Sequence, residues 1–263
     1  MQYKTSFAVF LILFLHSVYI SSQGADNMHM GDTPKKEIKN MAESDTMTEM
    51  EEVAHSFFSH MGVPEAVGVY SLRLSGLVTD MEGMMDGDFG FHLETGLTDF
   101  IGLHIRNDGI RDAQHTEVMF QFAAIRSRDK MSGFSPLIEF EFPTKPGGDR
   151  HTNVLVGFTT ALAGPGLAFN QALHYNSRTE EFEFNASFVA KVGSRIFPIV
   201  EIFAEALPHE KPIINVLGGV KVKVSKKLLL GVAFQAPVTE QKDYSWQLIF
   251  QPDIEWKRNT MKK

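Results

Sequence analysis

From residue 69 onward, apolar and polar residues alternate along most of the chain with a period of two. A β-strand places successive side chains on opposite faces, so this pattern predicts strands with one apolar and one polar face. The clearest run covers residues 244–256, which is longer than ordinary strands of about five or six residues. Its apolar parity holds Tyr244, Trp246, Leu248, Phe250, Ile254 and Trp256, and its polar parity holds Ser245, Gln247, Gln251, Asp253 and Glu255.

About twelve such segments follow one another, and no helical stretch interrupts them. Consecutive strands without crossover helices form an antiparallel meander. The sequence therefore predicts strands near residues 69–79, 87–97, 100–106, 115–126, 134–143, 152–162, 166–175, 180–192, 195–206, 212–224, 227–238 and 244–256.

The connections between these segments differ in length at the two ends of the predicted sheet. Most links from even to odd strands are tight, at 98–99, 164–165, 193–194 and 225–226, although 127–133 is longer. Links from odd to even strands are longer and more polar, at 80–86, 107–114, 144–150, 176–179, 207–211 and 239–243. Short turns at one rim and longer loops at the other are typical of bacterial outer-membrane barrels.

Alternation alone does not decide which face lies inside. A soluble β-domain buries its apolar face, whereas a membrane barrel turns it to lipid and keeps the polar face in the lumen. Strand length, few edge-protecting Pro or Lys residues, and aromatic residues at the ends of the last strand favour the membrane arrangement. The predicted fold class is all-β, a closed antiparallel up-and-down transmembrane β-barrel of about 12 strands with a short N-terminal helix.

The chain before residue 69 divides into a leader and a head. Residues 1–24 combine Lys4, an apolar run and small residues near position 24, which is the pattern of a secretory signal peptide; an N-terminal anchor is the alternative. Residues 25–68 read as a Met-rich periplasmic tether followed by an amphipathic helix at 45–61, which would pack on the barrel end or plug it. Residues 69–256 form the predicted outer-membrane barrel, and 257–263 a basic tail.

Composition narrows the class of protein further. The hydrophobic content is 43%, and after the leader no apolar stretch approaches the roughly 20 residues of a spanning helix. The net charge is −7, and removal of the leader with Lys4 makes the chain more acidic, which argues against a nucleic-acid partner. Cysteine is absent, so neither disulfides nor thiol chemistry are available.

Two segments carry the family resemblance. The segment 88–111 (DFGFHLETGLTDFIGLHIRNDGIR) and the closing segment 228–256 resemble the outer-membrane β-barrel transporters labelled "MetA-pathway of phenol degradation". The resemblance covers roughly residues 70–256. It implies an outer-membrane location and passage of small, hydrophobic or aromatic molecules, but it supplies no binding residues. The polar tail after Trp256 departs from barrels that end on an aromatic residue.

The polar parity supplies the candidate lumen residues. A charged lining serves either as a paired network that stiffens the barrel or as a cation-favouring constriction. Within it, His92, Glu94 and His104 flank one turn, so they form either a hydrogen-bond network or a metal site. The candidates are Arg73, His92, Glu94, His104, Arg106, Glu139, Glu141, Glu181, Glu183, Lys191, Lys221, Lys223, Gln247, Gln251, Asp253 and Glu255.

The sequence favours transport over catalysis. The strand histidines do not lie on the lipid-facing parity that a barrel hydrolase would use, and no nucleotide-binding or nucleophile motif is present. We expect a passive channel for small solutes that requires no cofactor. Its partners would be outer-membrane lipid and the barrel-insertion machinery. The alternatives are a non-conducting structural or sensory barrel, and copper handling through Met28, His29 and Met30, which otherwise belong to a flexible tail.

Overall fold

The structure is a computed structural model that describes residues 53–107, 109, 115–127, 131–144 and 151–257. Within these ranges the chain is all-β, and none of it forms a helix that could cross a membrane. The predicted leader, the head up to residue 52, which includes Met28, His29 and Met30, and the tail after residue 257 lie outside the described residues.

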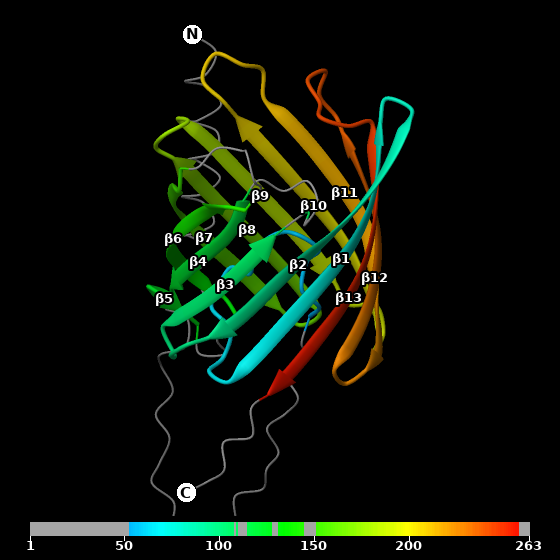
Figure 1. Cartoon of the computed structure of the whole chain (residues 1–263). Coiled ribbons are helices and arrows are strands. Elements are labelled where there is room, and N and C mark those ends of the chain that lie inside the picture. Colours follow the sequence, from blue (N-terminus) through cyan, green and yellow to red (C-terminus); the bar gives the residue numbers. More distant parts are fainter. Residues whose placement is uncertain (1–52, 108, 110–114, 128–130, 145–150, 258–263) are drawn as a thin grey trace, which may run out of the picture. The chain divides into compact units, whose positions relative to one another are not determined.

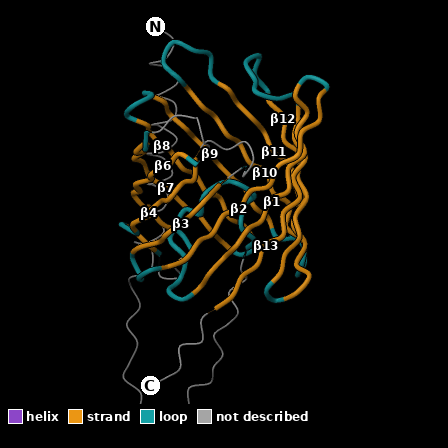
Figure 2. Tube along the Cα trace, viewed as in Figure 1, coloured by secondary structure: helices purple, strands orange, loops and turns teal. Residues whose placement is uncertain are grey.

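Antiparallel strands joined in sequence order form one sheet that closes on itself (Figures 1 and 2). The first strand pairs with the last, and β4 pairs with β6, so every wall position has two neighbours. The strands are β1 (Val69–Met81), β2 (Met84–Gly96), β3 (Ile101–Asn107), β4 (His115–Phe122), β5 (Ile125–Arg126), β6 (Gly133–Pro143), β7 (Asn153–Gly164), β8 (Leu167–Asn176), β9 (Glu181–Ala190), β10 (Ile196–Ala206), β11 (Ile213–Ser225), β12 (Leu228–Pro237) and β13 (Trp246–Lys257).

The barrel has 12 wall positions, because β4 and the two-residue β5 share one of them. Both pair with β6, and only Ala123 and Ala124 separate them. The closed 12-stranded barrel predicted from the alternation is therefore confirmed. Strand bounds agree with the predicted segments to within about three residues, since the period of two continues to the end of each strand.

The first connection differs from its prediction. Residues 80–86 were expected to form a longer polar loop, but β1 and β2 extend into this region and meet at a two-residue turn. Glu82 and Gly83 have φ values of 56° and 91°, the left-handed geometry of the turns that suit twisted hairpins. The contrast between a short-turn rim and a long-loop rim is weaker than the sequence indicated.

The outer face of the barrel is apolar. Phe89 is 70% exposed, Phe234 51% and Val222 40%, and the polar residues that alternate with them point inward. Aromatic side chains stack across strands on this face, as Tyr70 does with Trp256 and Phe234 with Trp246. Such a face costs free energy in water in proportion to its area, so this is the fold of a transmembrane barrel.

The segment 53–68 corrects the expected helix. Residues 53–61 of the predicted helix 45–61 are irregular, and the segment runs through the lumen of the barrel, as Figures 1 and 2 show. A helix would bond its amides to its own carbonyls, whereas side chains of the wall bind the amides of Phe57 and Ser59. We call residues 53–68 the lumen segment.

Closure of the barrel can be tested at the β1–β13 seam. Val78 and Leu248 are direct partners there, both side chains are exposed, and the chain has no cysteine of its own. Directly opposed strand residues lie within disulfide range. We expect the pair Val78→Cys with Leu248→Cys to cross-link on mild oxidation, as measured by non-reducing gel mobility. The control pair, Val78→Cys with Val200→Cys on β10, should stay uncross-linked, and equal behaviour of the two pairs would contradict the seam.

Candidate functional site

A single carboxylate on β10 binds the turn of the lumen segment. Glu201 is fully buried and accepts hydrogen bonds from the backbone amides of Phe57, Phe58 (3.1 Å) and Ser59 (2.8 Å). The Ser59 hydroxyl adds a fourth bond at 2.8 Å. Consecutive amides that converge on one anion form a nest, which compensates the cost of burying the charge.

Cationic and amide side chains bind the carbonyls of the same turn. Arg73 on β1 and Lys221 on β11 donate to the carbonyl oxygen of Ser56 at 3.0 and 2.9 Å. Gln251 on β13 donates to the carbonyl oxygen of Phe57 at 2.9 Å. The turn is therefore held from both sides of its backbone by residues that lie far apart in the sequence.

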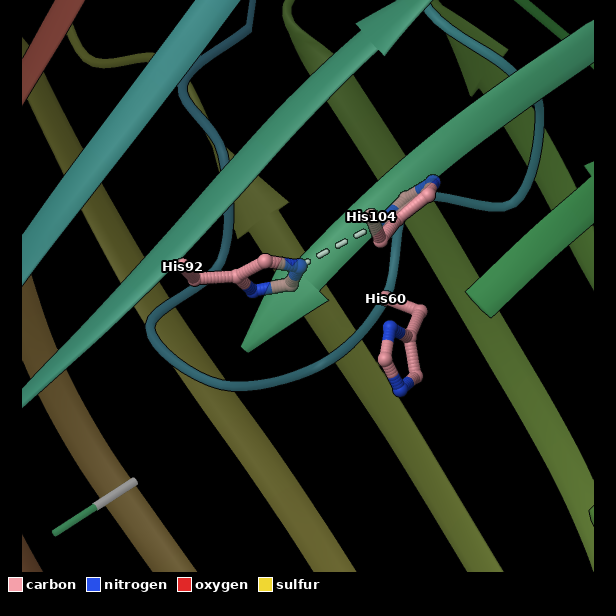
Figure 3. Close-up of side chains that lie close together, drawn as sticks. All are labelled: His60, His92 and His104. Carbon is pink, nitrogen blue, oxygen red and sulfur yellow. Dashed lines mark hydrogen bonds between the residues drawn. The ribbon is translucent and has the colours of Figure 1, made fainter. Parts of the chain in front are cut away.

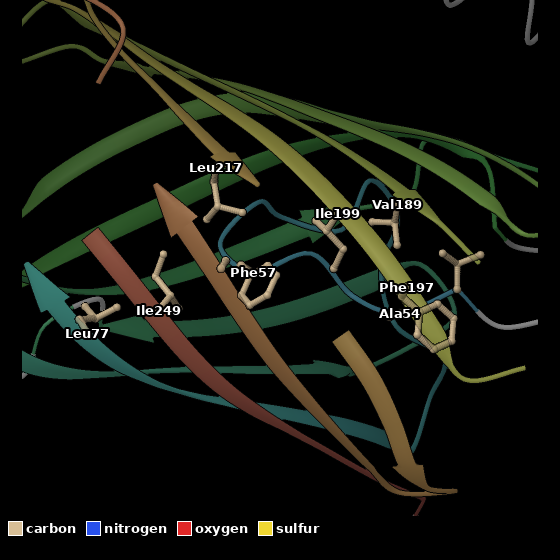
Figure 4. Packing of buried hydrophobic residues seen from close by; sticks show 10 residues of the cluster. Ala54, Phe57, Leu77, Val189, Phe197, Ile199, Leu217 and Ile249 are labelled. Atoms are coloured by element: carbon tan, nitrogen blue, oxygen red, sulfur yellow. The ribbon is translucent and has the colours of Figure 1, made fainter. Parts of the chain in front are cut away.

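The phenyl ring of Phe57 fills an apolar pocket in the inner wall. It is completely buried and packs in one cluster with Leu217, Ile249 and Ala233 (Figure 4). A Cβ atom at Gly231 would lie 2.8 Å from this ring, so the glycine makes room for it. The remaining core members are Val53, Ala54, Leu77, Val189, Phe197 and Ile199.

This apolar pocket was missed by the sequence reasoning, which treated the inward parity as polar. Its wall residues share that parity, as Ile249 does between Gln247 and Gln251, and Leu217 does between Asn215 and Gly219. The pocket could have been found in the sequence from the isolated apolar residues at positions whose neighbours of the same parity are polar. Such residues indicate a pocket only when an apolar side chain, here Phe57, is known to lie inside the barrel.

The second half of the lumen segment contacts the opposite part of the wall. Gln121 on β4 donates to the carbonyl oxygen of Met61 at 2.8 Å, and Asn170 on β8 accepts from the amide of Gly62 at 3.1 Å. Arg126 on β5 donates to the carbonyl oxygen of Pro64 at 2.7 Å. The segment therefore crosses the lumen from one wall to the other.

The ends of the segment are joined by an ion pair. His55 Nε2 lies 3.1 Å from a carboxylate oxygen of Glu65, and His55 Nδ1 lies 3.1 Å from the Ser71 hydroxyl. Burial lowers the pKa of His55, but the hydrogen bond and charge of Glu65, with Glu94 and Asp253 behind it, raise that pKa to about 9. The segment is thus a closed loop of the kind whose ends meet and whose own side chains fill its interior.

The structure places the predicted lumen residues at two levels of burial. Arg73 pairs with Glu94, Lys221 with Asp253 at 2.7 Å, and Arg106 with Glu117 at 2.6 Å. Lys191, Lys223 and Glu255 lie close to the strand ends, away from this centre. Buried are Arg73, His92, Glu94, His104, Glu139, Lys221, Gln251 and Asp253; partly exposed are Arg106, Glu141, Glu181, Glu183, Lys191, Lys223, Gln247 and Glu255.

Four buried histidines meet at the centre of the lumen. The ring of His60 lies 5.7 Å from His92, 5.8 Å from His104 and 5.1 Å from His174, between ring centroids; Figure 3 shows the first three residues. Only His92 and His104 could be brought together from the sequence, because they flank one hairpin. The expected helix gave His60 no wall partner, and the position of His174 across the lumen follows only from barrel closure.

A cavity lies beside the lumen segment, in the part of the lumen nearer the longer loops. Its volume is about 250 Å³. Phe58 from the segment and Phe203 from β10 meet edge-to-face there, with ring centroids 6.2 Å apart. Arg106, Glu183, Glu205, Asn215, Gln235 and Gln247 contribute polar groups. The cavity thus combines an aromatic surface with amide and carboxylate groups, a combination that suits a small amphipathic molecule.

Comparison with known proteins shows the fold. No family model and no curated protein matches the chain. Among solved structures it is similar to the KdgM porin in complex with disordered oligogalacturonate (11% identity, TM-score 0.52, 72% of this chain and 99% of that chain). It is also similar to the NanC porin (10%, 0.51, 72% and 100%) and to the COG4313 outer membrane channel from Pseudomonas putida F1 (8%, 0.51, 74% and 98%). The chain therefore has the fold of outer-membrane β-barrel channels.

Replacement of Gly231 tests whether the Phe57 ring packs in the apolar pocket of the inner wall. In Gly231→Ala the new methyl carbon would lie 2.8 Å from the Phe57 ring and 3.0 Å from Lys221 Cγ. Overpacking of this kind costs about 1–3 kcal/mol, so amide exchange of residues 56–60 should accelerate by roughly tenfold or more in hydrogen-exchange mass spectrometry. The matched control is Gly218→Ala on the outer face, where nothing lies within 4 Å. Equal exchange in both variants would contradict the packing.

The His55–Glu65 pair gives a pH prediction. Because the folded pKa of about 9 exceeds the ordinary value near 6.5, the pair stabilises the loop fully below about pH 6.5 and loses this contribution as the pH rises through 9. Burial lowers the pKa of His55, and the hydrogen bond and charge of Glu65 are the main factors that raise it. Glu65→Gln removes the charge, so the pKa of His55 should fall. NMR titration of ¹⁵N-labelled histidines in detergent micelles measures this directly, and an unchanged pKa would refute the pairing.

Proposed function

We propose that this chain is a passive outer-membrane channel for small solutes, closed in the present structure by its lumen segment. The observation that carries the proposal is the way the segment is held. Apart from the isolated bridge between Val67 and Gly96 and a turn bond from the Val69 amide to the Ala66 carbonyl, its bonds to the wall run through side chains rather than a strand ladder. Side-chain contacts of this kind can be broken without disturbing the barrel.

The amphipathic cavity supports a solute with an aromatic or hydrophobic part. Phe58 and Phe203 offer ring surface, and Glu183, Glu205 and Gln247 offer polar anchors beside it. This agrees with the resemblance to the phenol-degradation transporters, which we propose as the family. Movement of the segment would also move Phe58, so release of the lumen and release of a bound solute would be coupled.

A non-conducting structural or sensory barrel is the second candidate. The buried network around Arg73, Glu94 and Lys221 favours it, because breaking paired buried charges is costly. In a transport channel, these buried charges must stay paired when the lumen segment leaves the lumen. Arg73 keeps Glu94, and Lys221 keeps Asp253, when the segment leaves, which makes the channel the better supported reading. The copper alternative rests on Met28, His29 and Met30, which lie outside the described residues.

Conductance in planar bilayers separates the two candidates. Glu201→Ala removes the acceptor of four hydrogen bonds to the segment. Charge-assisted bonds contribute about 1.5–3 kcal/mol each, so we expect the open fraction to rise at least roughly tenfold over the unsubstituted chain. Deletion of residues 25–66 should leave a permanently conducting barrel.

The control variant is Glu210→Ala, in an exposed turn outside the lumen, which should conduct like the unsubstituted chain. Heat-modifiable gel migration shows whether each variant still forms a barrel. If the deletion variant migrates as a folded barrel and carries no current, the channel proposal is wrong and the non-conducting barrel takes its place.

A further inference from the structure

The centre of the lumen holds buried polar atoms that form no hydrogen bond among the described residues. Both ring nitrogens of His60 and both of His174 have no hydrogen-bond partner among the described residues, and neither does Oε2 of Glu139. His60 is 1% exposed, and His174 and Glu139 are each 2% exposed. Buried polar groups in folded proteins are nearly always hydrogen-bonded, so unbonded atoms gathered in one place point to a site that can hold an ion or water.

The three side chains converge from three parts of the chain. His60 lies on the lumen segment, Glu139 on β6 and His174 on β8. Each can place one ligand atom within 4.8 Å of the other two, and His174 Nδ1 already lies 3.4 Å from Glu139 Oε2. Two imidazoles and one carboxylate form a donor set that zinc and similar divalent ions bind, with bonds of about 2.0–2.2 Å. Small side-chain rotations would bring the atoms to that distance.

The surrounding charge favours a cation at this point. Glu117 and Glu141 place carboxylate oxygens within 4.8 Å of Glu139. Arg106 forms an ion pair with Glu117 at 2.6 Å, so the carboxylates outnumber this guanidinium in the cluster. A divalent ion beside Glu139 would offset the repulsion among them.

We propose that His60, Glu139 and His174 form a binding site for a divalent transition-metal ion of the zinc type, which fastens the lumen segment to the β6–β8 wall. A fourth coordination position falls to water or to a solute. Metal binding does not require the barrel to conduct, so the metal site and the channel function can be tested separately.

A second histidine set provides the internal comparison. His92 and His104 also lie within reach of His60. Their nitrogens, however, are already engaged. His92 Nδ1 accepts from Arg73 at 2.7 Å, and His104 Nε2 lies 3.2 Å from the amide oxygen of Gln121. Ligation by this pair would break existing hydrogen bonds, so we assign the metal to the set whose ring nitrogens form none in the described part of the chain.

Metal titration of the full chain in detergent micelles tests the site. Met28, His29 and Met30 are replaced by Ala in every sample, because they could bind metal themselves. We expect one Zn²⁺ per chain by calorimetry, and enhanced visible absorption when Co²⁺ is bound. His60→Ala, His174→Ala and Glu139→Gln should each weaken binding by more than about 100-fold, the upper end of the loss expected from a supporting partner alone. His60→Ala leaves every strand pair intact, so loss of binding there does not reflect loss of the barrel.

His151→Ala, an exposed histidine outside the lumen, is the control and should bind like the parent. Zn²⁺ should also slow amide exchange of residues 57–62 in the parent but not in His60→Ala. Absence of stoichiometric binding would overturn the proposal. Loss of binding in His92→Ala and His104→Ala, with His174→Ala unaffected, would overturn it equally, since the ligands would then be the other set.

Discussion

The burial of Glu201 under the backbone amides of residues 57–59 is the interaction on which the interior of this barrel depends. A barrel of twelve strands is wider than the eight-stranded barrels whose own inward side chains fill the interior. Its charged inward groups therefore need partners at the centre. The lumen segment supplies them as amides and carbonyls, and at the same point Phe57 covers the apolar part of the wall.

This arrangement explains why the segment is irregular. A helix satisfies its own backbone and presents only side chains, whereas an irregular loop presents both amides and carbonyls to the wall. Glu201 uses the amides, and Arg73, Lys221, Gln121 and Arg126 use the carbonyls. The wall gives space where the loop approaches most closely, as at Gly231 beside Phe57. Wall and loop are therefore complementary in charge, hydrogen bonding and shape.

Around His60 this complementarity is incomplete, because both ring nitrogens of His60 form no hydrogen bond with the described residues. At residues 56–59 the wall binds amides and carbonyls of the segment, whereas the ring nitrogens of His60 and His174, which stack at 5.1 Å, form no hydrogen bond within the described lumen. The histidine cluster joins the loop to two distant walls, since His92 and His104 come from β2 and β3, and His174 from β8. A ligand held there would act on the position of the loop, and through Phe58 on the cavity beside it.

The strands, their number and the antiparallel barrel could be predicted from the sequence alone, because a period of two is a local property of each segment and recurs along most of residues 69–256. It also brought His92, Glu94 and His104 together, since residues flanking one turn are neighbours whatever surrounds them. The course of residues 53–68 and the contacts of Phe57, His60, Glu201 and His174 became visible only in the folded barrel. Each of these contacts spans more than a hundred residues, or crosses the lumen, and no local pattern encodes a partner that far away. Within residues 53–61, wall side chains that bind the backbone amides and carbonyls outweigh the helical spacing of the side chains.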